Sequence, residues 1–425
     1  MSAQGTVYNP GQSAAITAIM SWLDDDAQDF FVLAGPAGTG KTFTVQGLLP
    51  LIRGKVVFTA PTNKATKVLR DTLRSDDYPN PDCRTIYSLL GLQLKANGEL
   101  KELAEPDDEI DLSSYRLIIV DEASMVNANL MTFINRAVDN TGVKVLFMGD
   151  QFQLPPVKEP NSPVWALPCP KAELTEVMRQ RNKILDTVTM IRAGISHPAP
   201  RWKFEDANDG GEGVFRPTSA AFMQAVDLSA TNGEFQRPNG AKLVAWRNAT
   251  VDKMNDHIRK ILWGPGAAMW VQGDRLTLLE PANDLDGKKQ ASTDDEGTVD
   301  SATVAYHPVF GQFKCWSLKV TLDENKVVHL WAIHPDSLRD FELEKEHRAV
   351  EARANPRLWG KFWELCEAFH SVRHAYAITT HRAQGSTYET AFVYMTDILL
   401  NRNVAEARRC LYVACSRPRK RLYLA

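Results

Sequence analysis

The sequence has no long apolar run and no paired cysteines. None of its stretches approaches the roughly 18 apolar residues that a membrane-spanning helix needs, so we expect no membrane segment. Residues 1–6 lack the basic-then-apolar order of a secretory leader. The cysteines form no C-x-x-C pair and no pattern with histidine, which favours free thiols in a reducing cytoplasm over disulfides or structural zinc; they are Cys83, Cys169, Cys315, Cys366, Cys410 and Cys415.

The sequence also lacks an excess of positive charge. It has 49 Lys and Arg residues against 52 Asp and Glu residues, a net charge of −3. A protein that coats nucleic acid is usually basic, so any contact with nucleic acid must lie in a local groove. With 425 residues, of which 44% are hydrophobic, the chain can form about two to four domains with buried cores.

Short apolar runs alternate with helical patterns in the first third of the chain. The runs are residues 30–34, 56–60, 117–120 and 143–148, and they resemble strands buried on both faces of a parallel sheet. Alternation of strands and helices predicts an α/β fold. A second region of this kind has apolar runs at residues 243–246, 391–395 and 421–424, so an insertion of about ninety residues interrupts it.

The insertion, residues 281–370, has a different pattern. Residues 298–306, 313–321 and 326–334 alternate like antiparallel strands, which predicts a small β barrel or sheet. Residues 336–370 then follow helical spacing. Residues 200–240 are rich in Gly, Asn, Asp and Pro, and we expect them to form a linker.

One glycine-rich segment predicts a nucleotide site. Residues 35–42, G-P-A-G-T-G-K-T, fit the pattern G-x-x-x-x-G-K-[ST] between a predicted strand and a predicted helix. Backbone N–H groups at such a helix start wrap phosphates; Lys41 reaches the β- and γ-phosphates and the Thr42 hydroxyl ligates Mg²⁺. The predicted nucleotide-binding residues here are Gly35, Pro36, Ala37, Gly38, Thr39, Gly40, Lys41 and Thr42.

Two carboxylates, Asp121 and Glu122, follow the predicted strand 117–120. After a phosphate-binding loop, such a pair divides the work: Asp121 binds Mg²⁺ and Glu122 polarises the attacking water. The residues themselves therefore predict a hydrolase of nucleoside triphosphates.

Further motifs narrow the class. In order along the chain they are residues 60–65 (A-P-T-N-K-A), 121–125 (D-E-A-S-M), 149–157 (G-D-Q-F-Q-L-P-P-V), 377–385 (A-I-T-T-H-R-A-Q-G) and 411–417 (L-Y-V-A-C-S-R). With the phosphate-binding loop, the series resembles superfamily 1 DNA helicases of the RecD/Dda-like group, which moves 5′ to 3′. The resemblance implies two RecA-like domains of the P-loop NTPase fold, ATP and Mg²⁺ as cofactors, and DNA as the track.

The resemblance implies further roles at the ATP site. Gln12 matches the glutamine that reads adenine, and Gln153 matches a γ-phosphate sensor. Arg179 and Arg417 match γ-phosphate arginines, which stabilise a loose transition state only when the cleft closes. Gly385 closes the motif at 377–385 and joins the nucleotide-binding set.

The resemblance also assigns residues to DNA: Thr62, Asn63, Lys64, Tyr87, Asn248, Thr380 and His381. Hydroxyls and a lysine suit phosphate contact without base readout. Tyr87 stands where the family usually has histidine, and it either stacks on a base or fills the core. Arg382 replaces a common lysine, and the pair Cys415-Ser416 replaces a more usual threonine-containing pair beside Arg417.

A hairpin is predicted between residues 92 and 103, where apolar and polar residues alternate on both sides of Asn97-Gly98. The resemblance implies a pin that splits duplex DNA, with Lys95, Ala96, Asn97 and Gly98 at its tip. The hairpin segment 92–103 has no aromatic residue that could stack on a base, so we expect it to act as a steric wedge, steadied by the helices at 336–370. The domains expected are thus 1–90 with 105–190, the hairpin 91–104, 191–280 with 371–425, and an SH3-like barrel with helices at 281–370.

These features predict an ATP-dependent DNA helicase that moves 5′→3′ on single-stranded DNA and unwinds duplexes. Two alternatives stay open: an ATP-gated single-stranded-DNA translocase or clamp without processive unwinding, and a small-molecule kinase, which would leave the motifs at 149–157 and 377–385 unexplained. We expect single-stranded and tailed duplex DNA, and single-strand-binding or replisome proteins, as partners. We also expect a monomer in the cytoplasm, or in the host cytoplasm if the chain is of phage origin.

Overall fold

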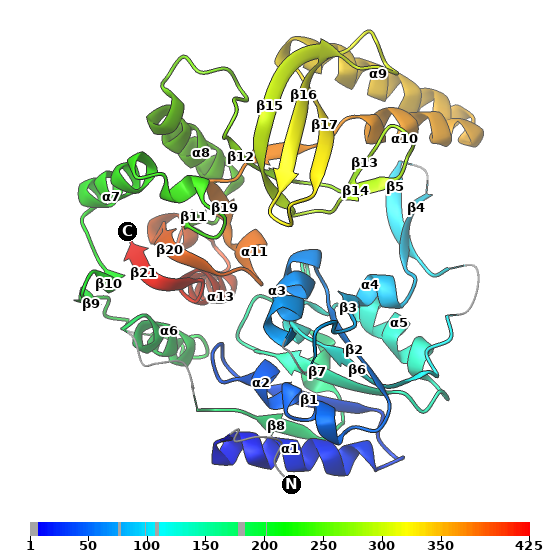
Figure 1. Ribbon diagram of the computed structural model, residues 1–425, viewed down its shortest axis with the longest axis vertical. Coiled ribbons are helices and arrows are strands. Elements are labelled where there is room, and N and C mark those ends of the chain that lie inside the picture. Colours follow the sequence, from blue (N-terminus) through cyan, green and yellow to red (C-terminus); the bar gives the residue numbers. More distant parts are fainter. Residues whose placement is uncertain (1–6, 75–77, 98, 107–109, 177–182, 201) are drawn as a thin grey trace.

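The computed structural model describes residues 7–74, 78–97, 99–106, 110–176, 183–200 and 202–425. Figure 1 shows a first unit at the bottom, a second unit at the left and an insertion at the top. The first unit is built on a parallel sheet of order β3-β2-β6-β7-β1-β8, which confirms the α/β prediction. Its strands are β1 (Phe30–Ala34), β2 (Lys55–Ala60), β3 (Cys83–Thr85), β6 (Tyr115–Val120), β7 (Lys144–Gly149) and β8 (Lys171–Glu173). Its helices are α1 (Pro10–Leu23), α2 (Lys41–Gln46), α3 (Asn63–Leu73), α4 (Ile86–Leu89) and α5 (Ala128–Val138), with short 3-10 turns at Leu49–Leu51, Ala123–Met125 and Pro163–Ala166.

Helices cover both faces of this sheet. Successive side chains of β1 point to opposite faces, so Phe31 and Leu33 pack in one hydrophobic cluster and Val32 in another. Helices α1 and α3 close the first cluster, and α4 and α5 close the second. Because both faces are buried, the strands are apolar without alternation, as the sequence predicts.

The second unit has a sheet of order β19-β11-β20-β21-β10-β9, in which only β9 pairs antiparallel. Its strands are β9 (Ala207–Asp209), β10 (Glu212–Phe215), β11 (Ala241–Ala245), β19 (Ala377–Thr379), β20 (Tyr388–Val393) and β21 (Pro418–Leu424). Its helices are α6 (Lys183–Gly194), α7 (Ser219–Thr231), α8 (Asn248–Trp263), α11 (Thr380–Ala383), α12 (Met395–Ile398) and α13 (Val404–Cys415), with a 3-10 turn at Glu234–Gln236.

The prediction that residues 200–240 form a linker is wrong. This segment supplies β9, β10 and α7 to the second unit. Its glycines have a local purpose: Gly210 and Gly211 adopt positive φ values of 58° and 85° between β9 and β10. A tight hairpin turn needs such residues, so the composition reflects a turn and not a flexible connection.

The insertion is an antiparallel sheet of order β17-β16-β15-β12-β18, with a small hairpin and two helices. The sheet strands are β12 (Arg275–Leu278), β15 (Glu296–Tyr306), β16 (Lys314–Leu322), β17 (Val327–Ile333) and β18 (Val372–His374). The hairpin is β13 (Ala282–Asn283) and β14 (Lys289–Ala291); the helices are α9 (Pro335–Ala354) and α10 (Trp359–Ala368), joined by a 3-10 turn at Pro356–Leu358. Strands β12 and β18 lie outside the predicted range 281–370, and the SH3-like barrel stays a prediction.

The predicted hairpin is present as β4 (Gln93–Asn97) and β5 (Leu100–Ala104), and Asn97 pairs with Leu100. Figure 1 shows it rising from the first unit toward α10. Gly98 lies outside the described residues. The Arg353 guanidinium of α9 binds the Glu99 carboxylate at 2.7 Å. The hairpin is thus tied to the helices of the insertion.

Among the helices in the described part of the chain, none combines the length and the apolar character of a membrane-spanning segment.

Candidate nucleotide site and strand-binding surface

The glycine-rich loop runs from the end of β1 to the start of α2. Gly38 and Gly40 adopt left-handed φ values of 86° and 79°, which side chains with a Cβ rarely take. A Cβ on Gly40 would lie 2.7 Å from the Gln12 amide nitrogen. Backbone conformation and close packing therefore both require glycine at this position.

Gln12 supports this loop from below. Its side chain is fully buried, and Nε2 donates to the Thr39 carbonyl oxygen at 3.2 Å. Its Oε1 accepts from the Asn9 amide, which completes a capping box at the start of α1. The structure thus gives Gln12 a contact with the loop itself; its reading of adenine stays a prediction.

Lys41 lies at the start of α2, and its amine donates to the carbonyl oxygens of Gly35 and Pro36 at 2.7 and 3.1 Å. Burial lowers the pKa of Lys41, and the carboxylates of Asp150 and Asp121 oppose this shift. A buried ammonium is costly without anions, so this position favours a polyphosphate beside it.

Asp121 and Glu122 stand at the end of β6. Glu122 has a positive φ of 52°, a left-handed conformation that costs a non-glycine residue about 1–3 kcal/mol and clusters at functional sites. The Asp121 Oδ1 accepts from the Glu122 amide at 2.9 Å. Burial and the neighbouring Asp121 raise the pKa of Glu122 to about 7, which suits a group that accepts a proton from water.

A cavity of about 420 Å³ brings the predicted ATP residues together from both units. The first unit contributes the loop, the carboxylates and Gln153; the second contributes Gly385 and Arg417. Of the predicted residues, those that line it are Ala37, Gly38, Gly40, Lys41, Thr42, Asp121, Glu122, Gln153, Gly385 and Arg417. Gln12 contacts the loop, and Gly35, Pro36 and Thr39 belong to it, but these four residues are not among those that line the cavity.

The oxygen atoms of Thr42 and Asp121 suit Mg²⁺, a hard cation that prefers oxygen ligands. A hydroxyl and a carboxylate leave its other positions to water and phosphate oxygens, which is the usual arrangement where Mg²⁺ serves a nucleotide.

Arg417 is buried, with 6% of its surface exposed, and its guanidinium is fixed by its own unit. Nη1 donates to the Ser386 carbonyl oxygen at 3.1 Å, and Nη2 donates to the Ser416 hydroxyl at 2.6 Å. Burial lowers the pKa of Arg417, and Glu122 opposes this shift. The pair Cys415-Ser416 replaces a threonine-containing pair of the family pattern, but Ser416 still supplies a hydroxyl that orients Arg417.

The two units meet through Gln384 and Arg409, two residues for which the sequence predicted no role. Gln384 of the second unit donates to the Ser124 hydroxyl at 3.2 Å and to the Gln153 side chain at 3.4 Å. Arg409 of α13 donates to the Gln153 carbonyl oxygen at 2.9 Å. The predicted γ-phosphate sensor thus connects the units directly. Gln384 could have been found, because it lies inside the motif at 377–385.

Asp150 is a second connection that sequence reasoning missed. Its carboxylate is fully buried and accepts from the Tyr412 hydroxyl of α13 at 2.5 Å. The Nε atom of Arg192, in α6, lies 3.6 Å from the Asp150 carboxylate, and the Arg192 guanidinium lies over the Phe152 ring. Arg179, the other predicted arginine, lies outside the described residues.

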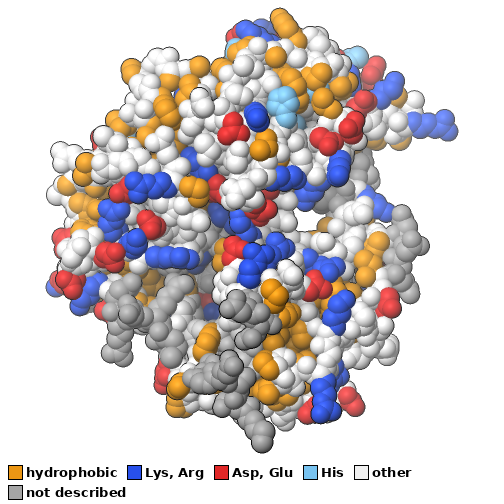
Figure 2. Space-filling model, in the orientation of Figure 1, with side chains coloured by type: hydrophobic (Ala, Val, Ile, Leu, Met, Phe, Trp, Pro, Cys, Tyr) orange, Lys and Arg blue, Asp and Glu red, His pale blue; other side chains and the backbone are white. Residues whose placement is uncertain are grey.

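The predicted strand-binding residues flank the junction of the three parts. Figure 2 shows Lys and Arg side chains gathered across the middle of this face, with Asp and Glu side chains among them. Thr62 caps α3, since its hydroxyl accepts from the Ala65 amide at 3.1 Å. Thr380 is fully buried and donates to the Ala245 carbonyl oxygen at 3.2 Å. Both hydroxyls thus have partners inside the protein.

Lys64 and Asn63 begin α3. Asn63 is exposed, whereas Lys64 is half-buried and its amine binds the Glu296 carboxylate of the insertion at 3.0 Å. Tyr87, in α4, is half-buried against the core of the first unit, which favours the packing role. Asn248 is exposed and accepts from Arg373 at 2.8 Å.

His381 is half-buried in α11; burial lowers its pKa, and the Glu406 carboxylate opposes this shift. Its Nε2 lies 3.5 Å from the Glu406 carboxylate, and the Cys410 thiol is close by. The spacing of cysteines and histidines in the sequence did not indicate this cluster, because His381 and Cys410 come together only when α11 packs on α13. Burial raises the pKa of Cys410, so it is a thiol and a poor metal ligand.

Comparisons with known proteins agree with this geometry. Two family models match: an AAA domain over residues 7–206 and a UvrD-like helicase C-terminal domain over residues 374–425. The chain is similar to the ATP-dependent DNA helicase Dda of Enterobacteria phage T4, with 25% identity over 96% of this chain and 97% of that protein. It is 27% identical to the ATP-dependent RecD2 DNA helicase of Deinococcus radiodurans, over 93% of this chain and 46% of that protein.

A solved structure shares the fold. The Pif1 helicase from Bacteroides, in complex with ADP-AlF3 and single-stranded DNA, aligns with 99% of this chain and 92% of its own at a TM-score of 0.54 and 17% identity. The two parallel-sheet units are therefore RecA-like domains. Motifs, fold and relatives agree: the chain resembles the superfamily 1 helicases of the RecD/Dda-like group.

Proposed function

We propose that this protein is an ATP-dependent DNA helicase that moves 5′→3′ along single-stranded DNA and unwinds duplexes ahead of it. The observation that carries the proposal is the cavity between the two RecA-like units. Lys41 and Glu122 line it from one side and Arg417 from the other. Hydrolysis there depends on how the units are placed relative to each other, which is what a motor needs.

At this site each side chain has one task. Lys41 would hold the β- and γ-phosphates, and Thr42 and Asp121 would hold Mg²⁺, which would neutralise charge on the phosphates. Glu122 orients the attacking water and accepts its proton. Arg417 stabilises the charge that develops on the γ-phosphate, and Gln153 reports its presence to the second unit through Gln384.

Movement follows if closure of the units changes the relative affinity of two grips on the strand. We assign one grip to Thr62, Asn63 and Lys64 at the start of α3 and the other to Thr380 and His381 in α11. If each grip bound the strand equally well in the open and closed states, closure would not move the protein along the strand. Since Thr380 is buried here, this grip requires its unit to rearrange.

The hairpin β4–β5 is proposed as the wedge that separates strands. It is solvent-exposed along Lys95, Asn97 and Glu99, and Arg353 anchors it to α9. A two-stranded hairpin is marginal alone, so this anchor gives it stiffness. The residues described at its tip include no aromatic side chain, which favours steric exclusion over stacking.

Tailed duplex DNA is the proposed substrate, and single-strand-binding or replisome proteins are the proposed partners. We further propose that the protein acts as a monomer in the cytoplasm, or in that of a host.

Unwinding assays on 5′-tailed and 3′-tailed duplexes test the proposal. We expect ATP-dependent strand separation on the 5′-tailed substrate and none with Lys41→Ala. Equal unwinding of both substrates would overturn the polarity. ATP hydrolysis stimulated by single-stranded DNA without any unwinding would instead support the alternative, an ATP-gated translocase or clamp.

A further inference from the structure

Helix α3, assigned above to the DNA backbone, is docked on an acidic part of the insertion. Lys64 binds Glu296 at 3.0 Å, and Lys67 lies 3.6 Å from Glu324. The two lysines are three residues apart, so they lie on neighbouring positions of one helix face. That face is turned toward carboxylates of the insertion.

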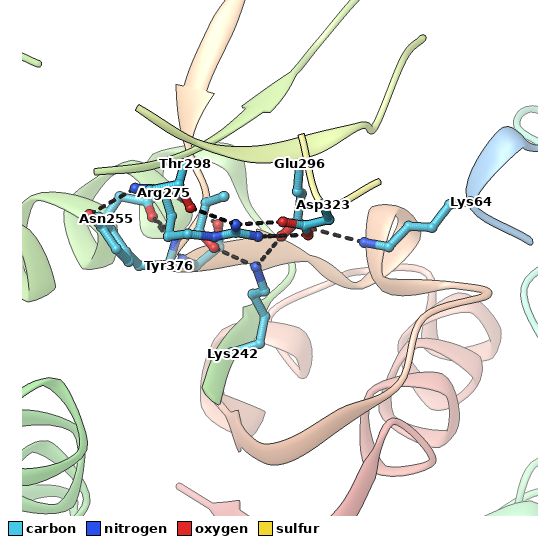
Figure 3. A network of polar contacts seen from close by, with 10 residues as sticks. Lys64, Lys242, Asn255, Arg275, Glu296, Thr298, Asp323 and Tyr376 are labelled. Atoms are coloured by element: carbon cyan, nitrogen blue, oxygen red, sulfur yellow. Dashed lines mark hydrogen bonds and ion pairs between the residues drawn. The ribbon is translucent and has the colours of Figure 1, made fainter. Parts of the chain in front are cut away.

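Glu296 is the centre of this contact (Figure 3). Its side chain is only 8% exposed and binds three cations from three elements. Lys242 of β11 approaches it at 2.8 Å and Arg275 of β12 at 3.5 Å, in addition to Lys64 of α3. Arg275 also makes a two-pronged ion pair with Asp323, with distances of 2.6 and 2.8 Å. First domain, second domain and insertion thus meet at one carboxylate.

The charges of this network balance without Lys64. Lys242 and Arg275 supply two cations, and Glu296 and Asp323 supply two carboxylates. Lys64 is the additional cation, and it is also more exposed than Glu296, at 18% against 8%. Its departure leaves a neutral, fully paired cluster, so no buried charge is stranded.

The ion pair is nevertheless firm. Burial alone would raise the pKa of Glu296, but Lys242, Lys64 and Arg275 hold it well below its ordinary value. Burial alone would lower the pKa of Lys64, but Glu296 holds it above its ordinary value. Both groups therefore stay charged while they are paired.

A cation of α11, the helix that carries the second proposed grip, is held in the same way. Arg382 of α11 binds Asp294 at 2.8 Å. Asp294 and Glu296, together with Lys64 and Lys67, line a cavity of about 290 Å³ between α3, the insertion and the second domain. Carboxylates thus hold cations from both strand-binding elements.

We propose that Glu296, with Asp294 and Glu324 beside it, is a built-in competitor of the DNA backbone. It binds Lys64 when the strand is absent and yields Lys64 to a phosphate when the strand enters. Exchange of one anion for another frees α3 from the insertion, so strand binding unlocks the first domain. The inference rests on the proposed function in one respect, the contact between Lys64 and DNA.

Binding of a fluorescent oligothymidine to the full chain tests this inference. We expect Glu296→Gln to tighten binding about three- to tenfold and to lower, by a similar factor, the DNA concentration that half-activates ATP hydrolysis. Glu324→Gln should tighten binding about twofold; Glu324 is 54% exposed, so this change does not threaten the fold. Glu344→Gln, which removes the same charge from a pair with Arg348 in α9, should leave both quantities unchanged.

A double mutant separates this mechanism from a general loss of negative charge. If Lys64 and Glu296 act as a pair, Glu296→Gln has no effect in a Lys64→Ala background. The inference is overturned if neither carboxylate variant tightens binding, or if the gain persists without Lys64. A wild-type chain that neither binds DNA nor hydrolyses ATP would instead refute the proposed function.

Discussion

At the scale of single residues, Arg417, the proposed γ-phosphate arginine, has its guanidinium oriented by its own domain. Its guanidinium is held by the Ser416 hydroxyl and by the Ser386 and Val413 carbonyl oxygens of its own domain. These bonds fix its direction before any substrate arrives, so little side-chain entropy is lost when the domains close. Glu122, the carboxylate proposed to activate water, lies across the cavity in the other domain.

We predict that Arg417→Ala spares nucleotide binding and lowers turnover by about 10³–10⁵, because such arginines act in the transition state. ATPase rates at saturating single-stranded DNA and the Kd of a fluorescent nucleotide measure the two effects. Lys41→Ala is the contrasting variant, since it should lose hydrolysis through loss of phosphate contact. Normal hydrolysis by Arg417→Ala would show that the role is misassigned.

Lys64 should contribute to DNA affinity without regard to sequence. We predict that Lys64→Ala weakens binding to different oligonucleotides equally and reduces the slope of log K against log salt by about one unit. Titrations at several salt concentrations measure this slope. A loss confined to certain base sequences would mean that Lys64 reads bases.

At the scale of elements, helices α9 and α10 lie beside the hairpin β4–β5. Arg353 binds Glu99, and a cavity of about 880 Å³ lies between the hairpin and the two helices. The hairpin pairs in register from Gln93 with Ala104 to Asn97 with Leu100. Its shape is thus set locally and its direction by the contact with α9.

We predict that shortening residues 94–101 to a tight glycine-containing turn abolishes most unwinding while DNA-stimulated ATP hydrolysis and translocation stay nearly intact. The reason is that a wedge acts only on the duplex. Arg353→Ala should slow unwinding less, because it loosens the wedge without removing it. Unwinding of a tailed duplex as fast as by the parent chain would refute the wedge.

At the scale of the whole molecule, the cluster around Glu296 joins both RecA-like domains to the insertion. Its effect on stability depends on pH with a definite sign. The folded pKa of Glu296 lies well below the ordinary value of 4.5, so the folded state binds the proton less readily than the unfolded chain. Its contribution is therefore complete above about pH 4.5 and declines as the pH falls toward the folded pKa.

We predict that the thermal midpoint of the wild-type chain falls between pH 5 and about pH 3.5, and that Glu296→Gln makes this decline shallower. Calorimetry or circular dichroism across this range measures both slopes. Glu344→Gln, in an ion pair within α9, serves as the matched variant. Identical slopes for Glu296→Gln and wild type would show that the cluster adds no pH-dependent stability.

Features of this protein that depend on short-range rules could be predicted from its sequence. Buried parallel strands, the glycine-rich loop before α2 and the hairpin around residue 97 all follow from spacing within a few residues. The error at residues 200–240 has the same origin, because Gly210 and Gly211 look alike in a linker and in a turn.

Contacts between side chains that are distant in the sequence could not be predicted in this way. Lys64 and Glu296 are 232 residues apart, and neither residue indicates the other in the sequence. Likewise, Thr380 looks like an accessible hydroxyl until β11 covers it, and Gln153 meets Gln384 only across the domain cleft. Long-range electrostatics and burial depend on how elements pack, and no local pattern carries that information.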